Sequence, residues 1–178
     1  MMQAFPHQYV ATAEVEGDGD VTVAAVGLPA LASASPREFD GPGGRWSPET
    51  LVTAAVADCF LLTFRGVARA SKFDWVAIRC AVEGTLDRVD RVVRFTRFRL
   101  RVTLVVPPEA DSPAGVDREG RAVRLVHKAH AGCLVANSLK ADTELAVEVV
   151  RASALDPPAA TGRASDTSVP GNDPTDGR

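Results

Sequence analysis

The residues best suited to chemistry in this chain of 178 residues are its three cysteines, Cys59, Cys80 and Cys133. The reactive form of cysteine is the thiolate, which acts as a nucleophile. Cys133 follows Gly132 at a predicted helix start, where unpaired backbone N–H groups favour a thiolate. Cys59 stands among large apolar residues of a predicted helix, and Cys80 lies on the apolar side of a predicted strand. From these surroundings alone, both are interpreted as small buried residues of the core.

A second set of potential ligands consists of His127, His130 and Cys133, which are spaced three residues apart. On one continuous helix this spacing would place three zinc ligands along one side. Gly132 interrupts the helical pattern, however, and no fourth ligand is evident in the sequence. Histidines near the end of a helix also complement its dipole. The sequence therefore predicts no metal and no cofactor, and zinc binding is kept as the lesser alternative.

Charge and hydropathy argue against several kinds of partner. The chain has 20 Lys and Arg against 23 Asp and Glu, a net charge of −3, whereas binding to nucleic acid or to an anionic membrane requires a cationic excess. The longest apolar stretch, residues 51–62, is shorter than the about 20 residues that cross a bilayer. The first ten residues lack the pattern of a signal peptide. We therefore expect a cytoplasmic protein with no nucleic-acid or membrane partner.

A long helix that carries Cys59 is predicted from about residue 48 to residue 71. Ser47 is suited to cap this helix, Pro48 to occupy its first turn and Glu49 to complement the positive end of its dipole. Most sides of the helix are apolar, with Asp58 among the few exceptions. A helix of this kind is enclosed by protein rather than lying on a surface.

Strands are expected before and after this helix. Residues 9–16 and 21–27 predict two strands joined by a turn of Gly and Asp. From Phe98 to Leu104 apolar and polar residues alternate strictly, which is typical of an antiparallel sheet with one wet face. Phe95 precedes Phe98 by three positions instead of two, so a β-bulge is expected near Thr96.

The remaining segments complete an α+β domain. The pattern predicts a strand at 76–82, a second helix at 117–130, a short helix at 133–139 and a last strand at 144–150. Residues 152–178 consist mostly of Ala, Pro, Asp, Gly, Ser and Thr, and cannot offset their ordering entropy by burial. We therefore expect one domain over residues 1–151 and a disordered tail over residues 152–178.

With these elements in place, the sequence resembles the OsmC/Ohr family of thiol-dependent hydroperoxide reductases. The resemblance rests on motifs that occur in the order expected for the family: Gly41-Pro42-Gly43-Gly44, Ser47-Pro48-Glu49-Thr50-Leu51, Ala54-Ala55, Cys59-Phe60, Ala129-His130-Ala131-Gly132-Cys133 and Asn137. It covers nearly the whole predicted folded unit. The family context implies an intertwined homodimer in which antiparallel sheets enclose long central helices.

The resemblance also implies a reaction. Cys59 would be the peroxidatic cysteine, which reduces an organic hydroperoxide to an alcohol and becomes a sulfenic acid. Cys133 would resolve it as a disulfide, which an external dithiol, such as a lipoyl-type reductant, then reduces. Loop aromatics such as Phe39 and Trp46 favour an apolar pocket for organic peroxides. The alternative is a non-catalytic OsmC-like protein that binds small molecules or acts in stress without peroxidase activity.

Two more residue types belong to the site that the resemblance implies. Glu49 matches the glutamate at the helix start, and the family places an arginine near the attacking sulfur. The first predicted hairpin contains no arginine, so Arg37 is the first candidate and Arg45 the second. Glu49 and Cys59 are ten residues apart, which separates them by about 15 Å along a straight helix. Glu49 is therefore expected to support the cysteine of a partner chain.

Overall fold

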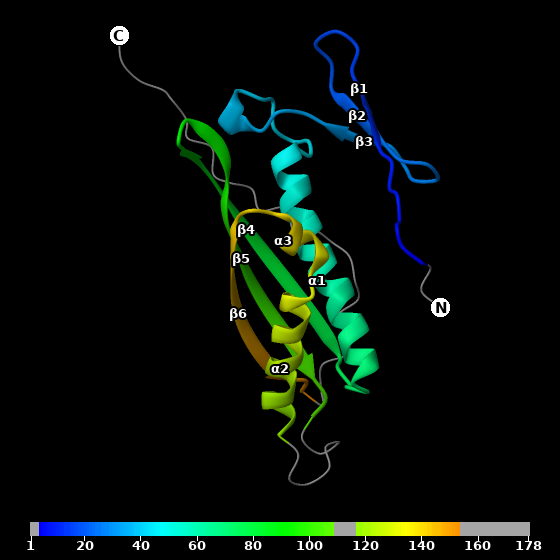
Figure 1. The fold of residues 1–178 in the computed structure, drawn as a ribbon, viewed down its shortest axis with the longest axis vertical. Coiled ribbons are helices and arrows are strands. Elements are labelled where there is room, and N and C mark those ends of the chain that lie inside the picture. The colour runs from blue at the N-terminus through cyan, green and yellow to red at the C-terminus, as the bar shows by residue number, and fades with distance from the viewer. Residues whose placement is uncertain (1–3, 109–116, 154–178) are drawn as a thin grey trace.

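The computed structural model describes residues 4–108 and 117–153 (Figure 1). Within these ranges the strands form two three-stranded sheets, and the helices lie against one of them. The first sheet contains β1 (Thr12–Glu14), β2 (Val21–Ala24) and β3 (Leu31–Ser33), and the second contains β4 (Ala77–Val89), β5 (Val92–Val106) and β6 (Asp142–Arg151). The helices are the 3₁₀ turn η1 (Arg37–Phe39), α1 (Pro48–Ala70), α2 (Arg118–Ala131) and α3 (Leu134–Ser138). The predicted α+β class is confirmed.

Helix α1 has the bounds and the cap that its sequence predicts. The Ser47 hydroxyl accepts a hydrogen bond from the Thr50 backbone N–H over 3.2 Å, and the Thr50 hydroxyl accepts one from the Ser47 N–H over 2.8 Å. This reciprocal capping box satisfies two backbone donors at the start of the helix. The helix then runs for 23 residues to Ala70.

Only one stripe of α1 is buried within the chain. The buried residues follow the helical spacing of four: Val56, Phe60, Phe64 and Ala68. Elsewhere the helix is partly open, and Leu62 keeps 54% of its surface exposed. By length and composition, the 23 residues of α1 could also cross a membrane, because the helix is longer than the apolar stretch at residues 51–62. Core helices that are enclosed in protein have the same length and composition. Of its most apolar window, 22% is buried in the single chain.

The second sheet gives α1 its packing surface. Strands β4 and β5 are antiparallel, and their register shifts where Thr85 pairs with Arg97 and Leu86 with Phe95, so that the extra residue is Thr96. The predicted bulge is confirmed. The alternation along β5 buries one row of side chains, Phe98, Leu100, Val102 and Leu104. On the other face, Arg97 and Arg99 pair with Glu144, and Arg101 pairs with Glu83.

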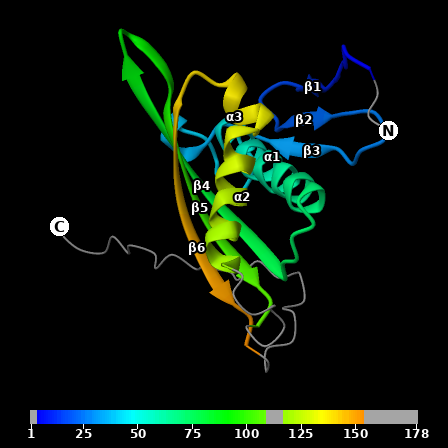
Figure 2. The same cartoon turned by 60° about the horizontal axis from the view of Figure 1, so that its bottom comes forward.

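The pairing of β6 corrects the expectation of purely antiparallel sheets. Strand β6 runs parallel to β5, with Leu100 beside Leu145 and Val102 beside Val147. The reason is the connection, because α2 and α3 intervene between the two strands and carry the chain back to the start of β5 (Figure 2). A helical crossover of this kind permits parallel pairing. The second sheet is therefore mixed.

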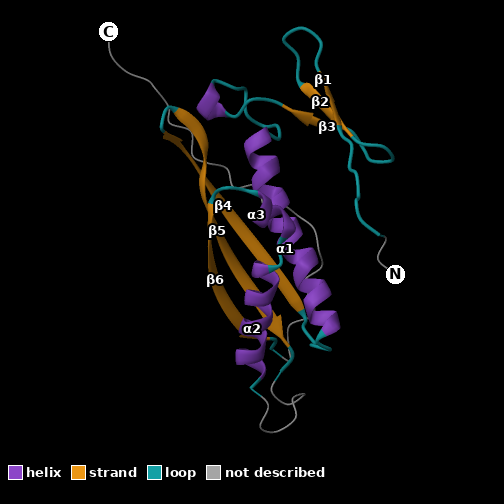
Figure 3. Ribbon diagram, in the orientation of Figure 1, coloured by secondary structure: helices purple, strands orange, loops and turns teal. Residues whose placement is uncertain are grey.

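The first sheet stands away from the rest of the chain (Figure 3). Its strands are shorter than predicted, and β3 has no counterpart in the predictions because three residues give no readable alternation. All residues of β1 are exposed, and in β2 and β3 only Ser33 is buried. Three short strands without a covered face are not stable on their own. The predicted tail beyond residue 153 lies outside the described residues.

Candidate dithiol site

Cys59 and Cys133, 74 residues apart in the sequence, lie side by side in the structure. The backbone N–H of Val135, in the first turn of α3, donates to Sγ of Cys59 over 3.4 Å. The thiol of Cys133 donates to the carbonyl oxygen of Val56 over 4.0 Å. Both cysteines are free thiols, and their side chains are within hydrogen-bonding reach of each other. The beginning of α3 is thus held on the middle of α1 through sulfur contacts.

The corner between α2 and α3 explains why these sulfurs meet. Helix α2 ends at Ala131, Gly132 follows, and Cys133 is the N-cap of α3. The position that a Cβ of Gly132 would take is 3.5 Å from the methyl group of Thr63 on α1, so the corner packs closely on that helix. Thr63 lies one turn after Cys59, and its hydroxyl donates to the Cys59 carbonyl oxygen over 2.8 Å. The predicted break at Gly132 is confirmed, and it directs Cys133 toward Cys59.

Burial, rather than the helix start, determines the ionisation of Cys133. The side chain is fully buried, and the loss of solvent raises the pKa of its thiol. Hydrogen bonds from the backbone N–H groups of Ala136 and Val135 lower the pKa, and the neighbouring Cys59 raises it further. The prediction that the helix start favours a thiolate at Cys133 is therefore wrong, because desolvation outweighs the N–H groups of a five-residue helix.

Cys80 has the core position that its sequence predicts. It is half-buried on the inward face of β4 and packs against the hydrophobic core. Burial, together with the charge of Cys133, raises the pKa of Cys80 to about 11. This thiol is therefore protonated at neutral pH.

The histidines and Cys133 do not share one helix. His127 and His130 lie in the last turns of α2, whereas Cys133 follows the break at Gly132 and begins α3. Burial and the nearby His127 lower the pKa of His130. Within residues 4–108 and 117–153, no three His, Cys, Asp or Glu side chains are grouped to hold a metal ion.

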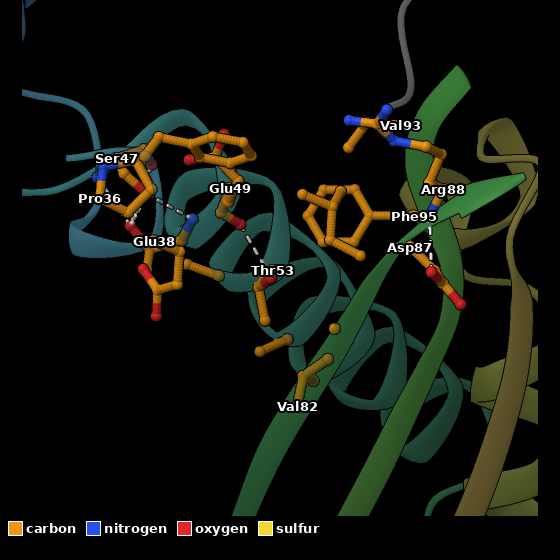
Figure 4. Close-up of a pocket in the computed structure, with 16 residues that line it drawn as sticks. Pro36, Glu38, Ser47, Glu49, Thr53, Val82, Asp87, Arg88, Val93 and Phe95 are labelled. Atoms are coloured by element: carbon orange, nitrogen blue, oxygen red, sulfur yellow. Dashed lines mark hydrogen bonds between the residues drawn. The ribbon is translucent and has the colours of Figure 1, made fainter. Parts of the chain in front are cut away.

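Glu49 lies on the wall of a pocket that the two sulfurs do not line. The pocket has a volume of about 720 Å³ and is enclosed by the first turns of α1, by η1 and by the tip of the β4–β5 hairpin (Figure 4). Phe39 of η1 and Phe95 of β5 both line it. Oε2 of Glu49 is buried and has no hydrogen-bond partner among the described residues. Within one chain, the structure therefore does not bring Glu49 to Cys59, in agreement with the helix spacing.

A glycine in β4 forms the floor of this pocket. A Cβ on Gly84 would lie 2.9 Å from Oγ1 of Thr53 and 2.9 Å from the ring of Phe95. Only a residue without a side chain therefore lets α1 approach the strand this closely. Thr53 in turn donates to the carbonyl oxygen of Glu49 over 2.8 Å, so the close approach also fixes the helix turn that carries Glu49 (Figure 4).

Neither candidate arginine reaches a cysteine within the chain. Arg37 is exposed, and its side chain packs on the backbone of Gly43, with Nε 2.5 Å from the position that a Cβ would take. Arg45 forms an ion pair with Asp20 at 2.7 Å. In the described part of the chain, neither guanidinium has a hydrogen bond or an ion pair with Glu49 or Cys59.

Arg88, which was not predicted from the sequence, lines the pocket from the hairpin opposite Glu49 (Figure 4). Its backbone N–H donates to Oδ1 of Asp87 over 2.6 Å. The signal was weak, because only the folded structure shows that this part of the hairpin and the first turns of α1 line the same pocket. No local motif reports such a contact.

Two free thiols on separate helices, placed side by side against an α+β core, define a protein of the dithiol class. A family model described as "OsmC-like protein" matches residues 41–148, which include both cysteines and Glu49. The chain therefore belongs to the OsmC-like protein family. The resemblance seen in the sequence is confirmed.

Relatives of this chain carry similar descriptions. The peroxiredoxin OsmC of Escherichia coli is 31% identical over 110 residues, which cover 60% of this chain and 68% of that protein. The Bacillus subtilis protein YmaD, described as uncharacterized, is 24% identical over 113 residues, covering 64% of this chain and 73% of its own length. Family membership and the Escherichia coli relative support a peroxiredoxin-like role.

Solved structures show the same fold. An organic hydroperoxide resistance protein OsmC from Legionella pneumophila superimposes with a TM-score of 0.63 at 26% identity, covering 83% of this chain and 99% of its own. An OsmC-like protein of unknown function from Vibrio cholerae superimposes with a TM-score of 0.70 at 18% identity, covering 80% of this chain and 100% of its own. At that identity the second match supports the fold alone.

Proposed function

We propose that this protein is a thiol-dependent hydroperoxide reductase in which Cys59 is the peroxidatic cysteine and Cys133 the resolving cysteine. The observation that carries the proposal is the contact between the Cys59 sulfur and the start of α3, next to the thiol of Cys133. A cysteine that forms a disulfide after its oxidation requires a second thiol beside it. Family membership and the peroxiredoxin among the relatives support the same assignment.

The reaction follows from the chemistry of sulfur. The Cys59 thiolate attacks the terminal peroxide oxygen, an S–O bond forms, the O–O bond breaks, and the alkoxide takes a proton to leave as an alcohol. The sulfenic acid on Cys59 then condenses with the Cys133 thiol, forming a disulfide and releasing water. An external dithiol, for which a lipoyl-type reductant is proposed, returns both cysteines to thiols by exchange.

The assignment of the two roles rests on burial. Cys133 is fully buried and has a raised pKa, so it remains a thiol in the resting protein. Cys59 is only partly buried. A hydroperoxide therefore reaches Cys59 more readily, and Cys133 reacts only after the sulfenic acid has formed beside it.

A homodimer is part of the proposal. The first sheet has no covered face, much of α1 is open, and the buried Oε2 of Glu49 has no partner among the described residues. A second copy packed on α1 would cover this surface and place Glu49 of one chain near Cys59 of the other. The guanidinium that supports the attacking sulfur is assigned to Arg37, with Arg45 second because Asp20 already binds it. We place this dimer in the cytoplasm.

The proposed substrates are organic hydroperoxides. The pocket beside Glu49 has about 720 Å³ of space and carries apolar side chains on both walls, among them Phe39, Leu86, Val93 and Phe95. A surface of this kind holds an organic substituent better than it holds hydrogen peroxide, which is small and polar. No cofactor is required for the steps described.

Turnover of cumene hydroperoxide with a dihydrolipoyl reductant tests the proposal. We expect the Cys59→Ser variant to lose essentially all activity, because it lacks the nucleophile. The Asp58→Asn variant, changed at the exposed neighbour of Cys59, serves as the control and should keep activity near that of the wild type. Equal rates in the wild type and Cys59→Ser would refute the proposal.

The second candidate function is that of a non-catalytic OsmC-like protein. It is favoured by one observation, namely that neither Arg37 nor Arg45 contacts Cys59 in the described chain. Counting thiols distinguishes the two functions. A reductase loses two thiols on treatment with a stoichiometric organic hydroperoxide and regains both with a dithiol, whereas a binding protein keeps all of its thiols.

A further inference from the structure

The reaction described above uses two of the three cysteines and leaves Cys80 without a role. β4 alternates between inward and outward residues, with Ile78, Cys80 and Val82 on the face toward the core. Cys80 pairs with Val102 of β5, and it packs against the core cluster that contains the buried Cys133. All three thiols of the chain therefore share one interior region.

The packing of α1 on β4 defines the position of Cys80 more closely. Gly84 lies against Thr53, and β4 runs back along α1 in the opposite direction (Figure 1). Cys80 is four residues before Gly84, or about 13 Å along the strand. This distance corresponds to about nine residues of helix, which brings Cys80 level with the turn of α1 that follows Cys59. The contact of Cys133 with α1 lies in the preceding turn.

We propose that Cys80 is a third redox position of the site, a latent thiol that exchanges into the Cys59–Cys133 disulfide and forms a Cys80–Cys133 bond. This inference rests on the proposed function, which supplies the first disulfide. In the exchange, the Cys80 thiolate attacks Sγ of Cys133, and the new S–S bond forms as the old one breaks. The electron pair leaves on Sγ of Cys59, which takes up the proton that Cys80 released. The number of disulfides does not change.

The surroundings of Cys80 make this exchange slow at neutral pH. Burial and the charge of Cys133 raise its pKa to about 11, so at neutral pH about one thiol in ten thousand is a thiolate. The thiolate population, and with it the rate of exchange, should increase about tenfold per pH unit below that pKa. Formation of the disulfide also removes the ionisable thiol of Cys133, which relieves one of the two causes of the raised pKa.

Among the described residues, no charged group lowers the pKa of Cys80. The neighbours of Cys80 on β4, Arg79 and Glu83, lie on the opposite face of the sheet, where Glu83 pairs with Arg101. On the middle of α1, Asp58 and Arg65 are exposed. The titratable group that acts on Cys80 is therefore Cys133 itself. The titratable residue that comes before Cys133 in the sequence is His130, which is half-buried at the end of α2.

The exchanged state has a distinct consequence for the site. Once Cys133 is bound to Cys80, Cys59 is again a free thiol but has no resolving partner. A second hydroperoxide would then leave Cys59 as a sulfenic acid, exposed to further oxidation. Cys80 would thus stop the catalytic cycle and leave Cys59 in an oxidised form.

Peptide mapping provides a direct test, because trypsin separates the three cysteines. Cleavage after Lys and Arg gives residues 46–65 with Cys59, residues 80–88 with Cys80 and residues 129–140 with Cys133. Full-length protein is oxidised with one equivalent of cumene hydroperoxide, held at about pH 7 or about pH 9.5, acidified, alkylated and digested. We expect the 46–65/129–140 pair at the lower pH, and at least a tenfold gain of the 80–88/129–140 pair at the higher pH.

A second arm does not depend on peroxidase activity. The Cys59→Ser variant is treated with diamide, which oxidises a pair of neighbouring thiols directly. We expect the 80–88/129–140 pair, and its absence in the Cys59→Ser, Cys80→Ser double variant. Failure of native Cys59→Ser to form this pair with diamide at either pH would overturn the inference. If the pair forms with diamide while cumene hydroperoxide oxidises no cysteine in the wild type, the proposed function fails and the position of Cys80 is upheld.

Discussion

The surroundings of Cys59 and of Glu49, two positions on helix α1, differ in how complete they are within one chain. Around Cys59, in the middle of α1, the neighbouring sulfur, the N–H donor from Val135 and the buried packing of Phe60 are all supplied by the same chain. Around Glu49, at the start of α1, the buried carboxylate oxygen has no partner among the described residues. The difference teaches that a single chain brings the two sulfurs together but leaves Glu49 without a partner among the described residues, which is the part that the proposed dimer would have to complete. The experiments below separate these two requirements.

The largest effect is expected on stability, when a side chain on the buried side of α1 is truncated and compared with one on the exposed side. Phe60 is fully buried, so Phe60→Ala should lower the free energy of unfolding by about 3–5 kcal/mol. Leu62 keeps 54% of its surface exposed in one chain, so Leu62→Ala should cost less than about 1 kcal/mol if the chain is a monomer. Urea unfolding at several protein concentrations measures both. A cost for Leu62→Ala that grows with concentration would show that a partner covers it.

The next effect concerns the resolving sulfur. Cys133→Ser should lower multiple-turnover activity with a dihydrolipoyl reductant at least about 100-fold, because the sulfenic acid on Cys59 cannot form its disulfide. The first turnover should survive, since Cys59 still attacks the peroxide. A rapid-quench measurement of the alcohol formed per subunit checks this. Unchanged steady-state turnover would show that an external thiol, and not Cys133, resolves Cys59.

A smaller effect on activity is expected at Glu49, in the first turn of α1. Glu49→Gln removes the charge and keeps the shape. Because Glu49 of one chain is proposed to support Cys59 of the other, the variant should lower kcat/KM for cumene hydroperoxide roughly tenfold. Disulfide formation by diamide between Cys59 and Cys133 should be unchanged, because that reaction needs no Glu49. Asp58→Asn provides a matched loss of one nearby carboxylate. If Glu49→Gln slows the diamide reaction as well, the surroundings of Glu49 and of Cys59 are not independent.

The smallest effect is expected at the cap that starts α1. Ser47→Ala removes the hydroxyl that accepts from the Thr50 N–H and should cost about 1 kcal/mol of stability. Because Glu49 lies in the same turn, the variant should also weaken the contribution of Glu49 to turnover. Thermal unfolding with parallel kinetics measures both quantities. A loss of stability with no change in kcat/KM would separate the cap from the positioning of Glu49.

Local chemistry explains which parts of the fold could be read from the sequence. The cap at Ser47 and the bulge implied by the spacing of Phe95 and Phe98 depend on neighbouring residues, and both were predicted. The parallel pairing of β6 was missed, because it depends on where α2 returns the chain. Strand β3 was missed because three residues carry no pattern.

The candidate site was predictable to the same extent. Family motifs identified Cys59, Cys133 and Glu49, and the structure places the two cysteines together. The ionisation of Cys133 was predicted in the wrong direction, because a helix start is a local property whereas burial under α1 is not. Arg88 could not be predicted, because its place beside the pocket depends on where the β4–β5 hairpin lies relative to α1 in the folded chain.

The extra residue at Thr96 gives that hairpin its bend. A bulge adds local twist to its strand, and this one lies between the part of β5 that packs in the core and the hairpin tip that lines the pocket with the first turns of α1. A chain that lacked Thr96 would place Phe95 two positions before Phe98, on the same inward face, so the lining of the hairpin would be preserved. Its arm would be straighter. A single inserted amino acid thus changes the direction of the hairpin arm without changing which side chains face the pocket.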